Sequence, residues 1–178
     1  MMKSMNVPTI VVASDIHGDA DAWALLLDRC RAHHGDELFL AGDIGVSSLP
    51  SLSLAPIPLA IVRGNCDSSY GFFEVGRPLP PLVQKREWNG KSIVMTHGDR
   101  YPTPYGMGMK EGDIFVFGHI HAARLYRDAD GIIILNPGST TYPRGGYPAS
   151  YAVLDEKAIT VRNFLTDKPF QTLDLRSR

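Results

Sequence analysis

The sequence predicts an α/β fold whose buried strands bring polar side chains to one edge of a sheet. Six short apolar runs, rich in β-branched and aromatic residues, recur along the 178 residues. Runs of this length and composition are typical of strands that are buried on both faces. A polar cluster follows each run, and one clearly amphipathic segment predicts a helix. Ligands bind at the carboxyl ends of strands in such sheets, so we expect a functional site there.

The six predicted strands are spread along most of the chain. They cover residues 10–13, 38–41, 59–62, 93–96, 114–117 and 132–135. The polar clusters that follow them read SDIHG, GD, RGNCD, HGD, GHIH and NPGS. Glycine flanks almost every cluster, and it lets the backbone turn sharply and approach an ion or a phosphate closely.

Residues 21–34 predict the clearest helix. Trp23, Leu26, Leu27 and Cys30 form one apolar stripe at helical spacing, so we interpret Trp23 as a core residue. Acidic residues near the start and basic residues near the end complement the helix dipole, and Gly35 is a natural C′ residue. We interpret His33 and His34 as solvated helix-end residues rather than metal ligands.

Three further segments complete the predicted organisation. Residues 151–154 and 158–161 predict a hairpin, and 170–175 predicts a final strand. The stretch 46–58 is rich in Ser, Leu and Pro, and we interpret it as an ordered loop over the core rather than as a hinge. Without repeats or low-complexity segments, residues 1–178 predict one domain that is long enough to bury a sizeable core.

Composition and charge narrow the classes of function. Lysine and arginine number 18 and aspartate and glutamate 19, which leaves a net charge of −1. This balance argues against a nucleic-acid polymer as partner, although bound cations supply positive charge for a small phosphorylated substrate. Cys30 and Cys66 are too few for a disulfide framework, so we expect reduced thiols. Residues 1–6 and the apolar run after them predict no signal segment or membrane span, and we expect a cytoplasmic protein.

Two pairs of alternate residues offer ligands for divalent cations. Asp15 and His17 are separated by one residue, so an extended strand end would point their side chains the same way. His119 and His121 repeat this spacing. Either pair alone is a weak signal, because a single Asp-x-His occurs by chance and a His-x-His is often just a polar strand end.

Three single residues extend the candidate ligand set. Asp43 can bridge two ions with its two carboxylate oxygens. Asn65 offers a carbonyl oxygen, and His97 offers an imidazole nitrogen. Oxygen and imidazole ligands without a thiolate favour manganese, iron, cobalt or zinc over calcium or a structural zinc. Five such clusters, in order and all at predicted strand ends, are not well explained as ordinary turns.

The ordered motifs resemble the motif series of the calcineurin-like metallophosphoesterases. The GNCD and NPGS variants further resemble the YfcE-like phosphodiesterase branch of that superfamily. The motifs are Asp15-x-His17, Gly42-Asp43, Gly64-Asn65-Cys66-Asp67, Thr96-His97-Gly98 and Gly118-His119-x-His121, and the resemblance runs from about residue 11 to residue 154. It implies a four-layer αββα sandwich, in which two mixed sheets face each other with helices outside.

The resemblance also implies how two divalent cations are bound. It places Asp15, His17 and His121 on the first cation and Asn65, His97 and His119 on the second, with Asp43 as the bridge. Manganese is the cation that the family often uses, and iron, zinc, cobalt or nickel can replace it. The expected reaction is hydrolysis of a small phosphodiester by a hydroxide that bridges the two cations. The resemblance further implies self-association, for which the apolar loop and the C-terminal strand offer an interface.

Asn65, Cys66 and His97 are the predicted catalytic residues. Many relatives in the wider superfamily carry histidine in place of Cys66, where it assists the leaving group or the transition state. A thiol has a reference pKa of about 8.5 and is a weak hydrogen-bond donor. We therefore predict that diesters with good leaving groups are hydrolysed in preference to monoesters. The alternative is that Cys66 is a small side chain that merely fits.

The substrate contacts and supporting residues have competing interpretations. The Asn65 amide and the Arg144 guanidinium are predicted to bind the substrate phosphate, whereas the simpler interpretation of residues 142–148 is an ordinary turn. Asp67 either orients a group next to the ligands or caps a turn. Asp99 stands where YfcE-like sequences usually have histidine, and we expect it to act as a supporting carboxylate.

Two other classes of function compete with this prediction. The retromer scaffold subunit resembles this fold but has an incomplete catalytic set, whereas all seven candidate ligands are present here. A catalytically weak interaction scaffold is therefore the main alternative. A nuclease is disfavoured by the near-neutral charge and by the lack of a basic, aromatic-rich groove in the sequence.

Overall fold

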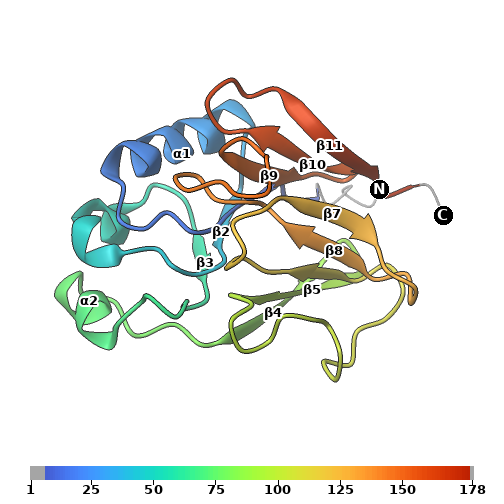
Figure 1. The fold of residues 1–178 in the computed structure, drawn as a ribbon, viewed down its shortest axis with the longest axis horizontal. Coiled ribbons are helices and arrows are strands. Elements are labelled where there is room, and N and C mark those ends of the chain that lie inside the picture. The colour runs from blue at the N-terminus through green and yellow to red at the C-terminus, as the bar shows by residue number, and fades with distance from the viewer. Residues whose placement is uncertain (1–6, 177–178) are drawn as a thin grey trace, which may run out of the picture.

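Two β-sheets pack face to face, and the helices lie on one side of the pair (Figure 1). The computed structural model describes residues 7–176, so the predictions for residues 1–6 lie outside the described residues. The six-stranded sheet contains β1 (Ile10–Ala13), β2 (Glu37–Leu40), β3 (Leu59–Ile61), β9 (Ser150–Leu154), β10 (Ala158–Asn163) and β11 (Pro169–Asp174). The five-stranded sheet contains β4 (Val83–Trp88), β5 (Lys91–Thr96), β6 (Ile114–Val116), β7 (Arg124–Arg127) and β8 (Ile133–Asn136).

Both sheets are mixed, with parallel strands at their centres. In the order β11-β10-β9-β1-β2-β3, strands β1, β2 and β3 run parallel, and β9 is antiparallel to β1. In the order β4-β5-β6-β8-β7, strands β5, β6 and β8 run parallel. These six parallel strands are the six that the apolar runs predict, and their carboxyl ends carry the polar clusters. The predicted hairpin and final strand are confirmed as β9, β10 and β11.

Alternating side chains divide the core into layers. Val11 and Ala13 of β1 face the helices, whereas Ile10 and Val12 face the second sheet. This alternation buries both faces of β1 and explains its continuous apolar sequence. Met107 and Met109, which belong to the long connection from β5 to β6, pack on the outer face of the five-stranded sheet. The predicted sandwich of two mixed sheets is confirmed. Within residues 7–176, this loop, and not a helix, covers the outer face of the five-stranded sheet beside β6.

Helix α1 (Ala20–Ala32) covers the six-stranded sheet. Its side chains Trp23, Leu26 and Cys30 are buried, which confirms the predicted apolar stripe and the place of Trp23 in the core. The Asp19 carboxylate caps the first turn. At the other end the left-handed residue is His34, with φ of 51°, and not the predicted Gly35. The predicted C′ position is wrong by one residue, because the helix ends one residue earlier than expected.

The C-terminal end of α1 is held by an ionic network. His33 hydrogen-bonds to Asp167 at 3.0 Å, and Asp167 also accepts from Tyr151 and Arg162. His33 is absent from the ligand clusters of residues 7–176, as predicted, but it is not merely solvated. The network joins the helix to the turn between β10 and β11.

Several short elements escape the sequence prediction. Strands β4 and β7 lie at the two edges of their sheet and carry charged side chains, so they lack a continuous apolar run. The stretch 46–58 covers the core as expected, but it contains the 3₁₀ helices η1 (Val46–Ser48) and η2 (Pro50–Leu54). Helix α2 (Ser69–Glu74) follows the GNCD motif. No helix within residues 7–176 has the length and apolar character that crossing a membrane requires.

Candidate metal centre

Loops from both sheets meet at the carboxyl ends of the parallel strands. The predicted ligands all lie on these loops: Asp15 and His17 follow β1, Asp43 follows β2, Asn65 follows β3, His97 follows β5, and His119 and His121 follow β6. Their contacts cross between the two sheets, because Asp15 meets His121 and Asp43 meets His97. The sandwich therefore gathers side chains that are up to 106 residues apart in sequence.

A left-handed backbone positions most of these ligands. Asp15, His17, Asp43, His119 and His121 have φ between 50° and 66°. Such angles are uncommon for residues other than glycine, although Asp and His tolerate them better than most. The extended geometry expected for Asp15 and His17, and for His119 and His121, is therefore wrong. These five residues instead have a left-handed backbone, which is a form of strain that often marks functional sites.

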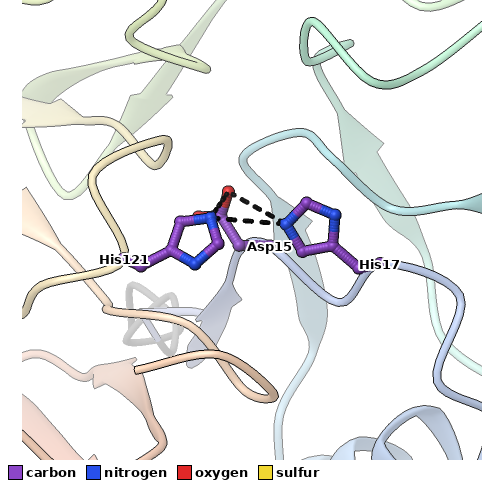
Figure 2. Close-up of side chains that lie close together, drawn as sticks. All are labelled: Asp15, His17 and His121. Atoms are coloured by element: carbon purple, nitrogen blue, oxygen red, sulfur yellow. Dashed lines mark hydrogen bonds and ion pairs between the residues drawn. The ribbon is translucent and has the colours of Figure 1, made fainter. Parts of the chain in front are cut away.

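Asp15, His17 and His121 form the first ligand cluster. Figure 2 shows the three side chains pointing toward one another, Asp15 and His17 from the loop after β1 and His121 from the loop after β6. His121 Nε2 lies 3.3 Å from Asp15 Oδ1 and 3.3 Å from His17 Nε2, and His17 Nε2 lies 3.9 Å from Asp15 Oδ1. His121 Nδ1 donates to the carbonyl of Tyr142 at 2.8 Å, so the Nε2 lone pair of a neutral ring faces the cluster.

Asp15 is a buried carboxylate with an unsatisfied oxygen. Its Oδ1 is buried and accepts no hydrogen bond, whereas Oδ2 accepts from the backbone N–H of His119 at 3.1 Å. Burial raises the pKa of Asp15, and the hydrogen bond from Ser14 and the nearby His97 and His121 offset only part of this effect. A buried carboxylate oxygen without a hydrogen bond is costly in free energy unless a cation occupies the adjacent space.

Asp43, Asn65 and His97 form the second cluster. His97 Nε2 lies 3.1 Å from Asn65 Oδ1 and 3.3 Å from Asp43 Oδ2. Burial on its own would raise the pKa of Asp43, but hydrogen bonds from His97 and from the Cys66 amide lower it to about 2. Burial would lower the pKa of His97, but Asp43 and the Ala41 carbonyl raise it to about 8. One oxygen atom of Asn65 and one of Asp43 thus lie within 3.3 Å of the same ring nitrogen.

His119 lies at the margin of the second cluster. Its ring packs edge-on against His97, with 5.1 Å between ring centroids, and its side chain is exposed. The three ligand groups found within residues 7–176 do not include it, although they link Asp15, Asp43 and His97 across both clusters. His97 therefore belongs to a ligand group, whereas His119 lies only beside it.

Close backbone contacts explain two of the glycine positions in the motifs. A Cβ atom at Gly64 would lie 2.0 Å from Asp43 Oδ1, and one at Gly118 would lie 1.9 Å from Ser14 Oγ. Real side chains do not approach so closely, so only glycine lets these loops pack against the ligands. Glycine here is required by the proximity of two loops rather than by its own backbone angle.

Asp67 braces two ligand loops. Its carboxylate accepts from the backbone N–H groups of Ile44, Gly45 and Gly64, at 2.9, 3.2 and 2.9 Å. These bonds tie the loop of Asp43 to the loop of Asn65, which matches the turn-capping interpretation and gives it a role in positioning. Asp99, by contrast, pairs with the exposed Arg100 at 3.9 Å, and its support of the ligands remains a prediction.

The NPGS motif and the residues after it hold the ligand loops in place through hydrogen bonds. Ser139 Oγ donates to the main-chain oxygen of Asp15 at 2.8 Å, and Thr141 Oγ1 donates to the same oxygen at 3.0 Å. Asn136 Nδ2 donates to the carbonyl of Gly118 at 2.7 Å. The residue pattern predicts the motif but not these contacts. Hydroxyl and amide side chains directly after a buried strand are the feature of the sequence that indicates such supporting hydrogen bonds.

A cavity of about 700 Å³ opens beside the first cluster. Its lining consists of His17, His121, Thr141, Tyr142, Pro143 and Arg144. Arg144 belongs to a turn, as its simpler interpretation holds, but its backbone N–H donates to the carbonyl of His121 at 2.9 Å. The predicted phosphate-binding side chain therefore lies on the wall of a cavity that also contains two ligand histidines.

The donor set fits divalent cations. The unsatisfied oxygen of Asp15, the facing nitrogens of His17 and His121, and the oxygen and nitrogen atoms around Asp43 are the donors that manganese, iron, cobalt and zinc accept. The hydrogen bonds from His121 Nδ1 and His97 Nδ1 to backbone carbonyls fix both rings in the orientation typical of metal-bound histidine.

Comparisons with known proteins place the chain among relatives. Residues 9–158 match the calcineurin-like phosphoesterase superfamily domain. Phosphodiesterase YfcE of Escherichia coli strain K12 is 28% identical over 166 residues, which cover 85% of this chain and 90% of that protein. The solved structure of YfcE, a phosphoesterase from E. coli, has a TM-score of 0.84 at 24% identity and covers 94% of this chain and 100% of its own. Vacuolar protein sorting 29 from Cryptosporidium parvum has a TM-score of 0.67 at 17% identity, over 95% and 98% of the two chains.

Proposed function

The chain belongs to the calcineurin-like phosphoesterase superfamily, and on that premise we propose that it hydrolyses small phosphodiesters with the help of two divalent cations. The observation that carries the proposal is the buried Asp15 Oδ1, which lacks a hydrogen bond and faces the ring nitrogens of His17 and His121. A buried carboxylate oxygen without a partner destabilises the fold, whereas a bound cation would offset the free-energy cost of burying its charge.

The proposed first cation is held by Asp15, His17 and His121, and the proposed second cation by Asn65, His97 and His119, with Asp43 as the bridge. When bound, the cations supply a water of lowered pKa and positive charge for the phosphoryl oxygens. We propose manganese, because the main ligands are carboxylate, amide and imidazole groups. The two free cysteines support a reducing compartment such as the cytoplasm, and self-association remains part of the proposal.

Asn65 and His97 act together at the second position. Asn65 Oδ1 faces His97 Nε2, which leaves the Asn65 Nδ2 group directed to the other side, 3.4 Å from Cys66 Sγ. The amide oxygen is thus oriented as a ligand, and the N–H group is available to a phosphoryl oxygen. Because Asn65 and Cys66 are both exposed, substrate can reach them from solvent.

Cys66 supports the preference for diesters. Burial and the Asp43 and Asp67 carboxylates raise the pKa of its thiol to about 11, so at neutral pH it remains a protonated, weak donor. A leaving alkoxide of a monoester would receive little help from it, whereas an aryloxide leaves without protonation. Replacing Cys66 with histidine would test this role. We expect Cys66→His to gain monoesterase activity on an alkyl phosphate, whose leaving alkoxide needs a proton, and an equal or greater monoesterase activity of the wild type on this substrate would contradict the proposal.

Arg144 supports recognition of the substrate phosphate. It lies on the cavity wall with His17 and His121, and its guanidinium group is suited to binding phosphate through two N–H groups. We expect Arg144→Ala to raise KM about tenfold, with a smaller change in kcat. Arg176→Ala is the matched control, because Arg176 is an exposed arginine that pairs with Glu156.

The main experiment measures hydrolysis of bis(p-nitrophenyl) phosphate after removal of bound metals and addition of a single divalent cation. We expect turnover with manganese, and loss of at least about a hundredfold in Asp15→Asn and His121→Asn, since ligand removal affects each step that the cations assist. Absence of turnover with manganese, iron, cobalt, nickel and zinc would refute the enzyme proposal.

A protein-interaction scaffold is the second candidate, and the fold shared with vacuolar protein sorting 29 is the observation in its favour. The gathering of Asp15, His17, His121, Asp43 and His97 favours the enzyme, because a scaffold has no need of strained ligand turns. A scaffold is expected to bind manganese, if at all, without turnover of any aryl phosphodiester.

A further inference from the structure

A third ligand group overlaps the two clusters and contains sulfur. Cys66 Sγ, a ring nitrogen of His17 and a carboxylate oxygen of Asp43 all lie within 4.8 Å of one another. The three residues belong to three different loops, which follow β3, β1 and β2. Neither the superfamily ligand set nor the proposed diester preference uses this sulfur as a donor.

We propose that Cys66 is an additional metal ligand, which with His17 and Asp43 gives the centre a separate binding mode for thiophilic cations such as cadmium, zinc and cobalt. The inference rests on the proposed function, because it shares His17 and Asp43 with the two proposed cation positions. Thiolate sulfur is a soft ligand that favours these ions over manganese. When the sulfur–metal bond forms, the S–H proton is released to solvent.

The local structure holds the sulfur in place. The Cys66 backbone N–H donates to Asp43 Oδ1 at 2.8 Å, and the adjacent Gly64 backbone packs so closely that a Cβ atom there would lie 2.0 Å from the same oxygen. The loop therefore cannot move away from Asp43 without losing a hydrogen bond. The Cys66 side chain has the bridging carboxylate on one side and solvent on the other, so a cation can reach it.

The distances suit an ion after a small side-chain rotation. Zinc binds nitrogen at about 2.0–2.1 Å and sulfur at about 2.3 Å, so a tetrahedral site separates the two donors by about 3.5 Å. Donors that start within 4.8 Å of one another need to close by at most about 1.3 Å at each contact. Because His17 and Asp43 take part in both modes, a thiophilic ion competes with manganese instead of binding beside it.

The experiment titrates the metal-free full chain with Co²⁺ and with Cd²⁺ and records the sulfur-to-metal charge-transfer absorption. Cys30 provides a matched control, because the sequence has two cysteines and Cys30 is buried on α1. We expect the band in the wild type and in Cys30→Ala, and its loss in Cys66→Ser. Cadmium affinity should fall at least about tenfold in Cys66→Ser, whereas manganese affinity should change less than about threefold.

Alkylation of the wild type gives a second readout that needs no variant. Saturating Cd²⁺ should protect Cys66 from iodoacetamide, as mapped by mass spectrometry, and Mn²⁺ should protect it much less. A wild type without the band, a band that persists in Cys66→Ser, or equal alkylation with and without Cd²⁺ would overturn the inference. Manganese-dependent diester hydrolysis, measured on the same preparations, separates the two proposals: turnover without a band refutes only the sulfur ligand, and a band without turnover refutes only the enzyme.

Discussion

His97 Nε2 lies 3.3 Å from Asp43 Oδ2, while the other ring nitrogen, Nδ1, donates to the Ala41 carbonyl at 2.8 Å. In the imidazolium form of His97, the proton on Nε2 therefore lies between two of the proposed ligands, His97 itself and Asp43. Burial disfavours this proton, but the hydrogen bonds to Asp43 and Ala41 outweigh burial and raise the pKa of His97 to about 8. A proton and a cation compete for the same pair of side chains.

Manganese affinity should therefore rise with pH. Below the pKa of His97 the bound proton must leave before the imidazole can act as a ligand, and above it the ligand is already free. With a pKa of about 8, the neutral fraction grows about tenfold between pH 7 and pH 9, most of it below pH 8. We expect the same gain in affinity, measured as free Mn²⁺ by electron paramagnetic resonance. An affinity that stays constant over this range would contradict the assignment of His97 as a ligand.

Asp15→Asn should separate stability from metal binding. Burial raises the pKa of Asp15, so its charge at neutral pH destabilises the metal-free fold, and removing the charge removes that penalty. We expect the metal-free variant to melt at the same temperature as the wild type or higher. Manganese at a hundred times its Kd should stabilise the wild type by about 2.7 kcal/mol and the variant far less. Thermal melts with and without manganese measure both effects, and a variant that gains as much as the wild type would refute the role of Asp15.

Asp67→Ala should weaken metal binding although Asp67 touches no cation in the proposed site. The substitution removes three backbone hydrogen bonds that join the loops of Asp43 and Asn65. Loss of such support typically lowers metal affinity about 10–100-fold. Asp155→Ala is the control, because Asp155 is an exposed aspartate that caps the turn between β9 and β10 through the backbone N–H groups of Lys157 and Ala158. Equal manganese affinities for the two variants, measured by calorimetry, would show that Asp67 only caps its turn.

Asp167→Asn should change acid stability and leave hydrolysis intact. Hydrogen bonds from Tyr151, His33 and Arg162 outweigh burial and hold the pKa of Asp167 well below its usual range. A lowered carboxyl pKa stabilises the fold above the unfolded-state value of about 3.9, and this stabilisation is lost as pH falls. We expect the variant to be about 1–2 kcal/mol less stable near neutral pH, with the difference shrinking below about pH 4. Urea unfolding at both pH values checks this, and a difference independent of pH would exclude the ionised carboxylate as its source.

The amino-acid sequence predicts those parts of the fold that are determined by burial. The central strands are apolar along their length because both faces are covered. Their positions, and the polar residues after them, can therefore be predicted from the sequence. The edge strands β4 and β7 cannot be predicted in this way, since an edge strand with charged side chains resembles a loop in sequence. The 3₁₀ helices and α2 are short and are defined by tertiary packing rather than by periodicity.

The candidate site is predictable in its residue types but not in its geometry. Asp15 and His17 were expected to converge through an extended backbone, yet both occupy left-handed turns. Nothing in the spacing of two residues distinguishes these conformations. The carbonyl groups of Ala41 and Tyr142, which orient His97 and His121, are backbone atoms and leave no mark on residue type. Only the fold places them.

Five proposed ligands that occupy left-handed turns make the chemistry easier to lose than the architecture. Asparagine and glycine accept these turns at least as well as aspartate and histidine do. A descendant could exchange one ligand after another through neutral drift, retain both sheets and give up turnover. The rim vacated in this way would still present several ordered loops, which natural selection could recruit for recognising another macromolecule.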